Sequence, residues 1–255
     1  MSAYAVLDAR FEYLLRFGDN TLVLGQRLAA WTGHAPIVEE DLALTNVALD
    51  LIGQARTWLA YAGECEGRGR DADDLAYARD GHEFRNVLLV EQRNGNFADT
   101  LARQFLFDAW HVLALERLGG SADSGVAGIA RKAHKEATYH LRRSADWVVR
   151  LGDGTDVSHA RMQAAVDALW PYTGELFAAD AVDFEMTSSG AGFEPGTLRG
   201  RWSQDVADVF ADATLSVPRE CWMQQGGKRG THSEHLTYLL AEMQSLRRSV
   251  AGERW

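Results

Sequence analysis

Four acidic residues, Asp50, Glu83, Asp108 and Glu136, stand on four different segments that are otherwise rich in apolar residues. An ionised carboxylate in a low-dielectric interior is costly unless a cation, a metal or a shared proton compensates for it. In four-helix bundles that hold two metal ions, two helices each give a Glu and the other two each give Glu-x-x-His. The order of the four acids along the chain fits this template, so the sequence raises the question of a di-metal site.

The histidines of the template are missing. Where Glu-x-x-His is required, the sequence has Glu83-Phe84-Arg85-Asn86 and Glu136-Ala137-Thr138-Tyr139, and Asn and Tyr are poor replacements for imidazole at divalent iron. His140 lies one residue late, which at about 100° per residue places it on the neighbouring flank of a helix. His111 follows Asp108 at i+3. We interpret both histidines as hydrogen-bonded core groups, with a ligand role as the alternative.

Cations near the acids offer another way to compensate their charge. Arg79, Arg85, Lys132, Lys135 and Arg143 could neutralise them through charge-assisted hydrogen bonds. We therefore predict a degenerate di-metal site that binds no metal. Its positions are Asp50, Glu83, Asn86, Asp108, Glu136, Tyr139 and His140.

The elements that must position these residues are helices. Only four prolines interrupt segments rich in Ala, Leu, Arg, Gln and Glu, which are good helix formers. The segment 39–63 carries an apolar stripe and a narrow polar strip that includes Asp50, and the segment 97–118 repeats this pattern with Asp108 and His111. Both patterns indicate largely buried helices. The predicted helices span 6–31, 39–63, 74–92, 97–118, 123–151, 157–180, 197–213 and 232–248.

Composition and charge exclude several classes of function. The formal net charge is −10, which argues against a nucleic-acid backbone or an anionic membrane as the main partner. Two cysteines, Cys65 and Cys221, are too few for a disulfide framework. The first residues lack the features of a signal peptide, and no apolar run reaches the roughly 18 residues of a membrane span. We expect a cytoplasmic protein.

Most of the chain resembles the family of structural subunits of phenylacetyl-CoA epoxidase, also called ring-1,2-phenylacetyl-CoA monooxygenase. The resemblance runs through LRFGDNTLVLGQRLAAWTGHAP (15–36), EEDLALTNVALDLIGQAR (39–56), EFRNVLLVEQRNGNFADTLARQFLFDAWHV (83–112), KEATYHLRRSADWVVRLGDGT (135–155) and GGKRGTHSEHLTYLLAEMQ (226–244). It implies a ferritin-like four-helix-bundle core with additional C-terminal helices. We expect a single domain over 1–255, with the segment from about residue 181 wrapping the bundle.

The resemblance also implies partners and a role. The chain would pair with a homologous catalytic subunit, whose di-iron centre activates dioxygen and epoxidises the aromatic ring of phenylacetyl-CoA, and a separate reductase would supply electrons. This chain would then have no catalytic residue, no metal and no cofactor of its own. Asn86 and Tyr139 are the departures from the metal-binding pattern.

Three segments are candidates for contact with the CoA ester. The first is Glu83 to Asn86, where Arg85 suits a carboxylate or phosphate, although an internal Arg–carboxylate pair is the alternative. The second is a glycine-rich turn with Lys228 and Arg229, which precedes a capping-box pattern at 231–234. The third, which we expect in a loop or short extended segment, comprises Phe184, Glu185 and Met186.

Two other functions stay open at this point. One is a self-contained ferritin-like di-metal oxidase or oxygenase that uses Asp50, Glu83, Asp108 and Glu136, with His111 or His140 as nitrogen ligands. The other is a stand-alone protein that binds CoA esters.

Overall fold

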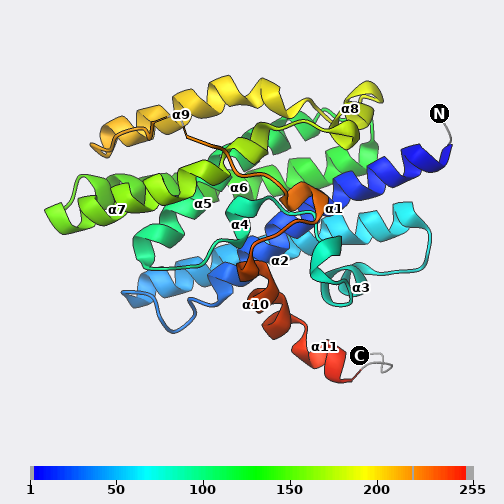
Figure 1. Cartoon of the computed structure of the whole chain (residues 1–255), viewed down its shortest axis with the longest axis horizontal. Helices are drawn as coiled ribbons and strands as arrows, with labels where there is room; N and C mark the ends of the chain where they lie inside the picture. Colours follow the sequence, from blue (N-terminus) through cyan, green and yellow to red (C-terminus); the bar gives the residue numbers. More distant parts are fainter. Residues whose placement is uncertain (1–2, 220, 251–255) are drawn as a thin grey trace. The chain divides into compact units, whose positions relative to one another are not determined.

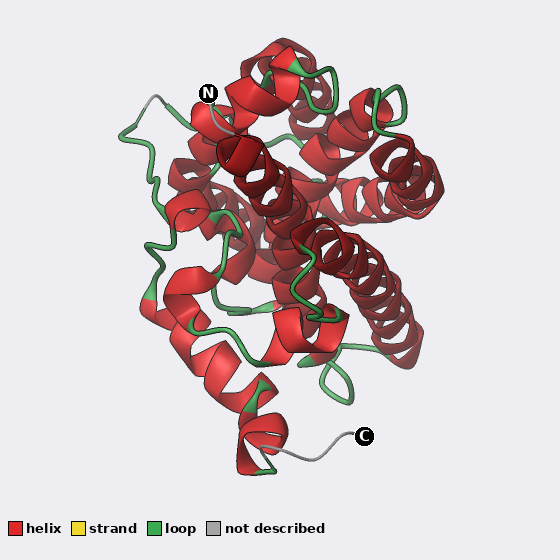
Figure 2. Ribbon diagram, turned by 90° about the vertical axis from the view of Figure 1, so that its right-hand side faces the viewer, coloured by secondary structure: helices red, strands yellow, loops and turns green. Residues whose placement is uncertain are grey.

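A computed structural model describes residues 3–219 and 221–250 of the chain. Within these residues the regular structure consists of α-helices and short 3-10 helices, with no strand (Figure 2). The predicted all-α class is therefore confirmed. The chain divides into two compact units, Met1–Gln92 with Gly226–Trp255 and Arg93–Gln225, and each is described by itself. The prediction of one domain over 1–255 stays a prediction.

The first unit is built on two long helices that lie side by side, α1 (Ala3–Ala29) and α2 (Val38–Glu66) (Figure 1). The face of α2 that carries Leu44, Leu51 and Trp58 is fully buried, as its three- and four-residue spacing predicts. The prediction that this helix is largely buried is wrong, because Leu42 and Leu49 on its opposite face are exposed. Gly18 lets the helices approach closely, because a Cβ at this position would lie 2.6 Å from Leu59 Cδ2.

The segment predicted as one helix over 74–92 is not one helix. It contains α3 (Ala72–Tyr77), the 3-10 helix η1 (Gly81–Glu83) and α4 (Leu88–Glu91). Between η1 and α4 the backbone is extended because side chains of α1 bind its amides. Arg85 N donates to Asp19 Oδ2 at 2.8 Å, and Val87 N donates to Asn20 Oδ1 at 2.8 Å. A contact from another helix thus overrides the local helical preference.

The C-terminal part of the first unit contains η5 (Gly227–Arg229), α10 (Glu234–Met243) and α11 (Ser245–Ser249). The helix predicted over 232–248 is therefore divided at Gln244. This side chain is buried and donates to the carbonyl oxygen of Arg79 at 2.9 Å. It ties the C-terminal helices to the segment after α3.

The second unit contains the long helices α5 (Phe97–Leu118) and α6 (Ser124–Gly152), which contact each other along their length. Most side chains of α5 are buried, so the prediction of a largely buried helix is confirmed. The remaining elements are α7 (Asp156–Leu169), η2 (Trp170–Tyr172), η3 (Gly174–Phe177), α8 (Ala181–Ser188), η4 (Pro195–Leu198) and α9 (Arg199–Asp212).

Two predictions for the second unit are wrong. The helix expected over 157–180 ends at Leu169, because Pro171 lacks an amide hydrogen, and a run of 3-10 turns begins at Trp170. Phe184 to Met186, expected in a loop or extended segment, lie within α8. Asp180 caps this short helix by accepting hydrogen bonds from Val182 N and Asp183 N.

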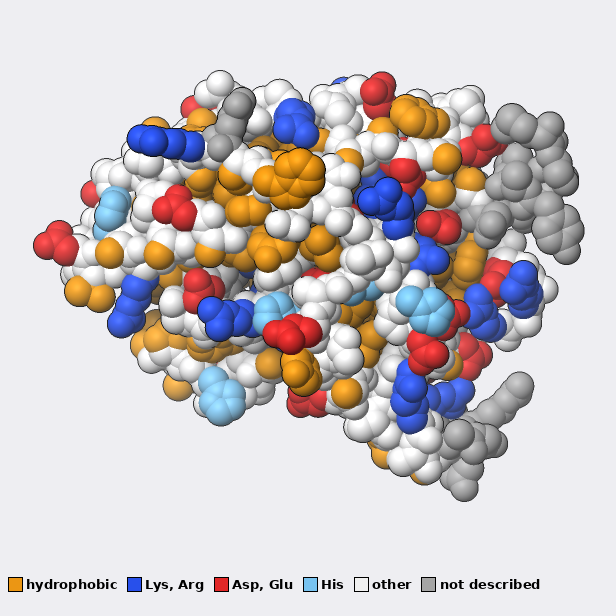
Figure 3. Space-filling view, viewed as in Figure 1, with side chains coloured by type: hydrophobic (Ala, Val, Ile, Leu, Met, Phe, Trp, Pro, Cys, Tyr) orange, Lys and Arg blue, Asp and Glu red, His pale blue; other side chains and the backbone are white. Residues whose placement is uncertain are grey.

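The surface agrees with the mixed composition of the chain. In the view of Figure 3, acidic, basic and apolar side chains are interspersed. No helix in the described part of the chain is long and apolar enough to cross a membrane.

Candidate functional site: two buried polar networks

A buried ion pair fixes the segment that carries the predicted site residues Glu83 and Asn86. Arg79 on the segment after α3 donates to both carboxylate oxygens of Asp19 on α1, with Nη1 3.0 Å from Oδ2. The Asp19 side chain is fully buried and that of Arg79 nearly so. The Arg79 guanidinium also stacks over the Phe84 ring, 4.3 Å from its centroid. The pair therefore organises the backbone of residues 79–85 from within the core.

The side chain of Arg85 binds residues of the first unit. Its guanidinium Nη1 donates to the carbonyl oxygens of His82 at 2.8 Å and Phe84 at 2.9 Å. Its Nε lies 3.2 Å from the carboxylate of Glu12 on α1. The structure therefore contains the internal Arg–carboxylate pair that was the alternative to a ligand contact.

A second carboxylate in the first unit, Glu91, is fully buried and was not identified from the sequence. Its Oε2 accepts hydrogen bonds from Asn86 Nδ2 at 2.9 Å and His232 Nδ1 at 2.7 Å, and its Oε1 accepts one from Ser233 N at 2.6 Å. Asn86 stands where the di-metal template requires a histidine, and here it donates a hydrogen bond to the Glu91 carboxylate instead. Sequence reasoning missed Glu91 because it stands in an apolar run, where only its burial singles it out.

The surroundings of His232 favour its protonated form. Its Nδ1 faces the Glu91 carboxylate and its Nε2 lies 3.1 Å from the carbonyl oxygen of Phe84. Both partners accept hydrogen bonds, so both ring nitrogens must carry a proton. Burial lowers the pKa of His232, but the hydrogen bond and charge of Glu91 and the Phe84 carbonyl outweigh it, and the net pKa is raised.

The start of α10 binds an anion from within the chain. The capping box predicted at 231–234 is not formed, since Ser233 and not Thr231 stands at the N-cap of α10, and the Ser233 side chain makes no cap hydrogen bond. Its backbone amide instead donates to Glu91. The positive end of a helix favours an anion, and Glu91 supplies it here.

The glycine-rich turn with Lys228 and Arg229 lies against the segment that contains Glu83 to Asn86. A Cβ on Gly227 would overlap the carbonyl oxygen of Asn86. Two of the three segments predicted to contact a CoA ester are therefore neighbours within the first unit.

In the second unit, Asp108 is fully buried between α5 and α6. Its Oδ1 lies 2.7 Å from Gln104 Nε2 and its Oδ2 lies 2.8 Å from Ser144 Oγ. Burial raises the pKa of Asp108 to about 8, although both hydrogen bonds and Arg143 act in the opposite direction. Asp108 is therefore protonated at neutral pH, and a proton compensates for its burial.

Two histidines lie in the same interior. His111 is fully buried among aromatic rings, with the Phe107 ring centroid 5.0 Å away. Burial lowers the pKa of His111 to about 3, with contributions from His140 and His134, so the ring is neutral. The expected hydrogen bonds of His111 are not found, since neither ring nitrogen has a protein partner within the described residues. His140 is also buried, on the face of α6 that carries Ser144.

The other predicted positions lie outside these cores. Asp50 and Glu136 are half-buried, and Tyr139 is 56% exposed. Glu83 caps η1 by accepting a hydrogen bond from Asp80 N at 2.8 Å. Within residues 3–219 and 221–250, no group of three His, Cys, Asp or Glu side chains is arranged to hold a metal ion. The donor set does not fit a di-metal centre.

The third predicted contact segment belongs to α8 in the second unit. Phe184 is 58% exposed, Glu185 is half-buried, and Met186 packs in the core.

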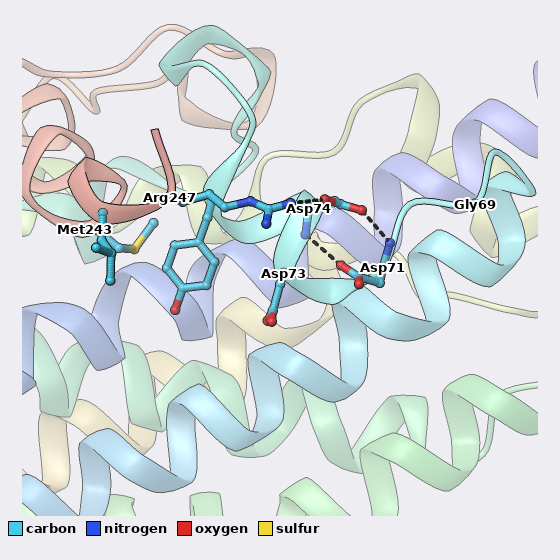
Figure 4. Close-up of a pocket in the computed structure, with 8 residues that line it drawn as sticks. Gly69, Asp71, Asp73, Asp74, Met243 and Arg247 are labelled. Carbon is cyan, nitrogen blue, oxygen red and sulfur yellow. Dashed lines mark hydrogen bonds and ion pairs between the residues drawn. The ribbon is translucent and has the colours of Figure 1, made fainter. Parts of the chain in front are cut away.

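A hollow of about 670 Å³ opens beside α3 and α11 (Figure 4). Asp74 accepts a hydrogen bond from Arg247 Nη2 at 2.8 Å and forms a reciprocal capping box with Asp71. None of the predicted site residues lines the hollow, and neither do Asp19, Glu91 or Asp108. Its lining residues are Gly69, Asp71, Asp73, Asp74, Tyr77, Met243, Leu246 and Arg247.

Within the described residues, long helices that pack side by side and bury polar residues on their inner faces define an all-α protein, in keeping with the ferritin-like class. The chain belongs to the family described as "Phenylacetic acid catabolic protein", which it matches over residues 2–255. It is similar to a subunit of the 1,2-phenylacetyl-CoA epoxidase of Escherichia coli (strain K12). The two are 54% identical over 243 residues, which cover 95% of this chain and 98% of that protein. The predicted family and fold class are therefore confirmed.

Proposed function

We propose that this chain is the structural, non-catalytic subunit of a phenylacetyl-CoA epoxidase in aerobic phenylacetate catabolism. Its likeness, along nearly its whole length, to a subunit of the Escherichia coli epoxidase carries the proposal. It supports a homologous catalytic subunit, which holds the di-iron centre, in a cytoplasmic complex that receives electrons from a reductase.

The buried polar residues support a non-catalytic role. Asp108 is compensated by a proton and by Ser144 and Gln104. Asn86 is bound to Glu91, whose carboxylate is compensated by His232. Each of these two buried acids thus has partners of its own, and neither needs a metal ion for its charge. These hydrogen bonds stabilise the fold, and the surface of that fold is then available to bind another subunit.

Metal content tests this role. The isolated chain and its complex with the catalytic subunit would be expressed in iron-rich medium and analysed for iron per chain. We expect iron only in the complex. About two iron ions per isolated chain, lost in Asp108→Asn and Glu136→Ala, would instead support the alternative, a self-contained di-metal oxidase.

We further propose that the Lys228–Arg229 turn, which rests against the segment 83–86, contacts the CoA part of the substrate in the complex. Two adjacent cations on a turn that rests against another loop suit phosphate groups. The variant Lys228→Ala/Arg229→Ala should raise the KM of the complex for phenylacetyl-CoA, and the exposed control Arg142→Ala should not. An unchanged KM in the double variant would exclude this contact.

A further inference from the structure

The outer face of α2 is apolar, which is unusual for a helix whose opposite face already packs in a core. Val38, Leu42 and Leu49 are 72%, 60% and 61% exposed. Their separations of four and seven residues place them on one side of the helix. Ile37, just before the helix, is 51% exposed as well. We call the three helical residues together with Gly53 the α2 stripe.

Burial on the other side of α2 does not account for this stripe. Leu44, Leu51 and Trp58 fill the inner face and are completely buried, which satisfies the need of an amphipathic helix for one apolar face. The outer face would ordinarily be polar. Apolar side chains gathered on one surface mark sites of interaction with another protein.

Gly53 is a second sign that another protein binds the outer face of α2. It stands inside a long helix, where glycine destabilises by roughly 0.5–1 kcal/mol relative to alanine. Gly18 has a reason in the first unit, since its Cβ would clash with Leu59, whereas a Cβ at Gly53 would meet nothing within 4 Å. The missing side chain leaves room on the outer face of α2 for the backbone of a second helix.

The charged residues beside the α2 stripe indicate what kind of partner helix could bind there. At about 100° per residue, Glu39, Asp50 and Glu64 follow one edge of the α2 stripe, and Arg56 stands at its C-terminal end. A partner helix with basic residues along the matching edge would complement the acids. A second copy of this chain is disfavoured, because its net charge is −10 and an antiparallel pair of α2 helices would set two acidic edges together.

We propose that a helix of the catalytic subunit, apolar on one face and basic along one edge, docks on the α2 stripe. This inference rests on the proposed function and adds the surface through which that function is exerted.

Binding of the purified catalytic subunit tests the inference. The variant Leu42→Glu/Leu49→Glu should weaken the complex about 100-fold, because it buries charges at the centre of an interface. Val157→Glu, in the second unit and with the same 61% exposure as Leu49, should bind like the wild type. Circular dichroism and thermal unfolding would show that each variant is folded.

Gly53→Leu provides an independent check. It should raise the thermal stability of the isolated chain, because leucine is the better helix former, yet weaken the complex by occupying the space of the partner helix.

The outcomes are separable. If the wild type binds the catalytic subunit and the stripe variants bind equally well, the docking surface is wrong and the proposed function stands. If the wild type does not bind it, the proposed function fails, and the inference fails with it. Self-association that the stripe variants abolish would show that a second copy, and not the catalytic subunit, occupies the stripe.

Discussion

Glu91 and His232 are separated by 141 residues in sequence, yet Glu91 Oε2 and His232 Nδ1 lie 2.7 Å apart in the interior of the first unit. The carboxylate is fully buried, and the imidazolium is its charged partner. The pair joins α4 to the start of α10, and Arg27 reinforces this junction by donating to the carbonyl oxygens of Glu91 and His235 at 2.7 Å.

Loss of the imidazolium should destabilise the first unit. His232→Ala leaves a buried carboxylate without its cation, so we expect the free energy of unfolding to fall by about 3 kcal/mol. Urea unfolding measures this loss, and His34→Ala, an exposed histidine, is the control. Equal stability of the two variants would contradict the role given to His232.

The contribution of His232 should depend on pH. Its folded-state pKa is raised, so the stabilisation is complete below the ordinary histidine pKa of about 6.5 and is lost as pH rises through the folded-state value. Asp19 and Glu91 favour the charged form, and burial opposes it. The difference in unfolding free energy between wild type and His232→Ala should thus be larger near pH 6 than near pH 9.

Asp108→Asn should be neutral or stabilising at neutral pH, which is the opposite of the usual result for a buried acid. The folded-state pKa is about 8 against an ordinary value of 3.8, so the wild type loses stability as pH rises from about 4 to about 8. The amide resembles the protonated acid and removes this loss, with a gain of about 1–3 kcal/mol near pH 7. Unfolding at several pH values, with the exposed Asp146→Asn as control, would reveal it. A large loss at pH 7 would mean that Asp108 is ionised.

Breaking the Asp19–Arg79 pair should destabilise the fold and loosen the segment 84–87. Asp19→Ala leaves a buried guanidinium unpaired, which costs about 3–5 kcal/mol, and removes the acceptor of Arg85 N. Hydrogen exchange at Arg85 should become faster, whereas the exposed Glu64→Ala should leave it unchanged. Unaltered exchange in Asp19→Ala would show that the α1 side chains do not hold this segment.

Two glycines should respond to alanine in opposite directions. Gly227→Ala would overlap the backbone of Asn86, so the turn with Lys228 and Arg229 must move and the thermal midpoint should fall. Gly128 on α6 has nothing within 4 Å of a Cβ, and its replacement should raise stability by up to about 1 kcal/mol through helix propensity. Equal effects would contradict the close packing of the turn.

The periodicity of apolar residues was sufficient to predict a helix whose bounds depend on its own sequence. It predicted 97–118 with the observed bounds, because Asn96 caps the first turn and apolar residues surround the helix. It failed over 74–92, where Asp19 and Asn20 on another helix bind the backbone amides. Contacts between distant segments are not encoded in the local pattern.

In the candidate site, too, the local sequence predicted some features, whereas others depend on contacts between distant segments. Asp108 was identified as an inward-facing acid because its helix is apolar on nearly all sides. The proton that compensates for its charge depends on burial by α6, which only the structure supplies. Glu91 was missed because it stands in an apolar run and its cationic partner, His232, is 141 residues away in sequence. The polar residues Asp19-Asn20-Thr21, between the apolar residues Phe17 and Leu22, were the available signal for the buried contacts of Asp19.

The order of the units along the chain has a consequence for synthesis on the ribosome. The first unit includes both Met1–Gln92 and Gly226–Trp255, so the second is inserted within it. Glu91 therefore leaves the exit tunnel long before His232 is made, and the second unit can fold before the first acquires its closing segment. The Glu91–His232 pair can form only after α10 has been synthesised, so we expect burial of Glu91 to be a late event in the folding of the first unit.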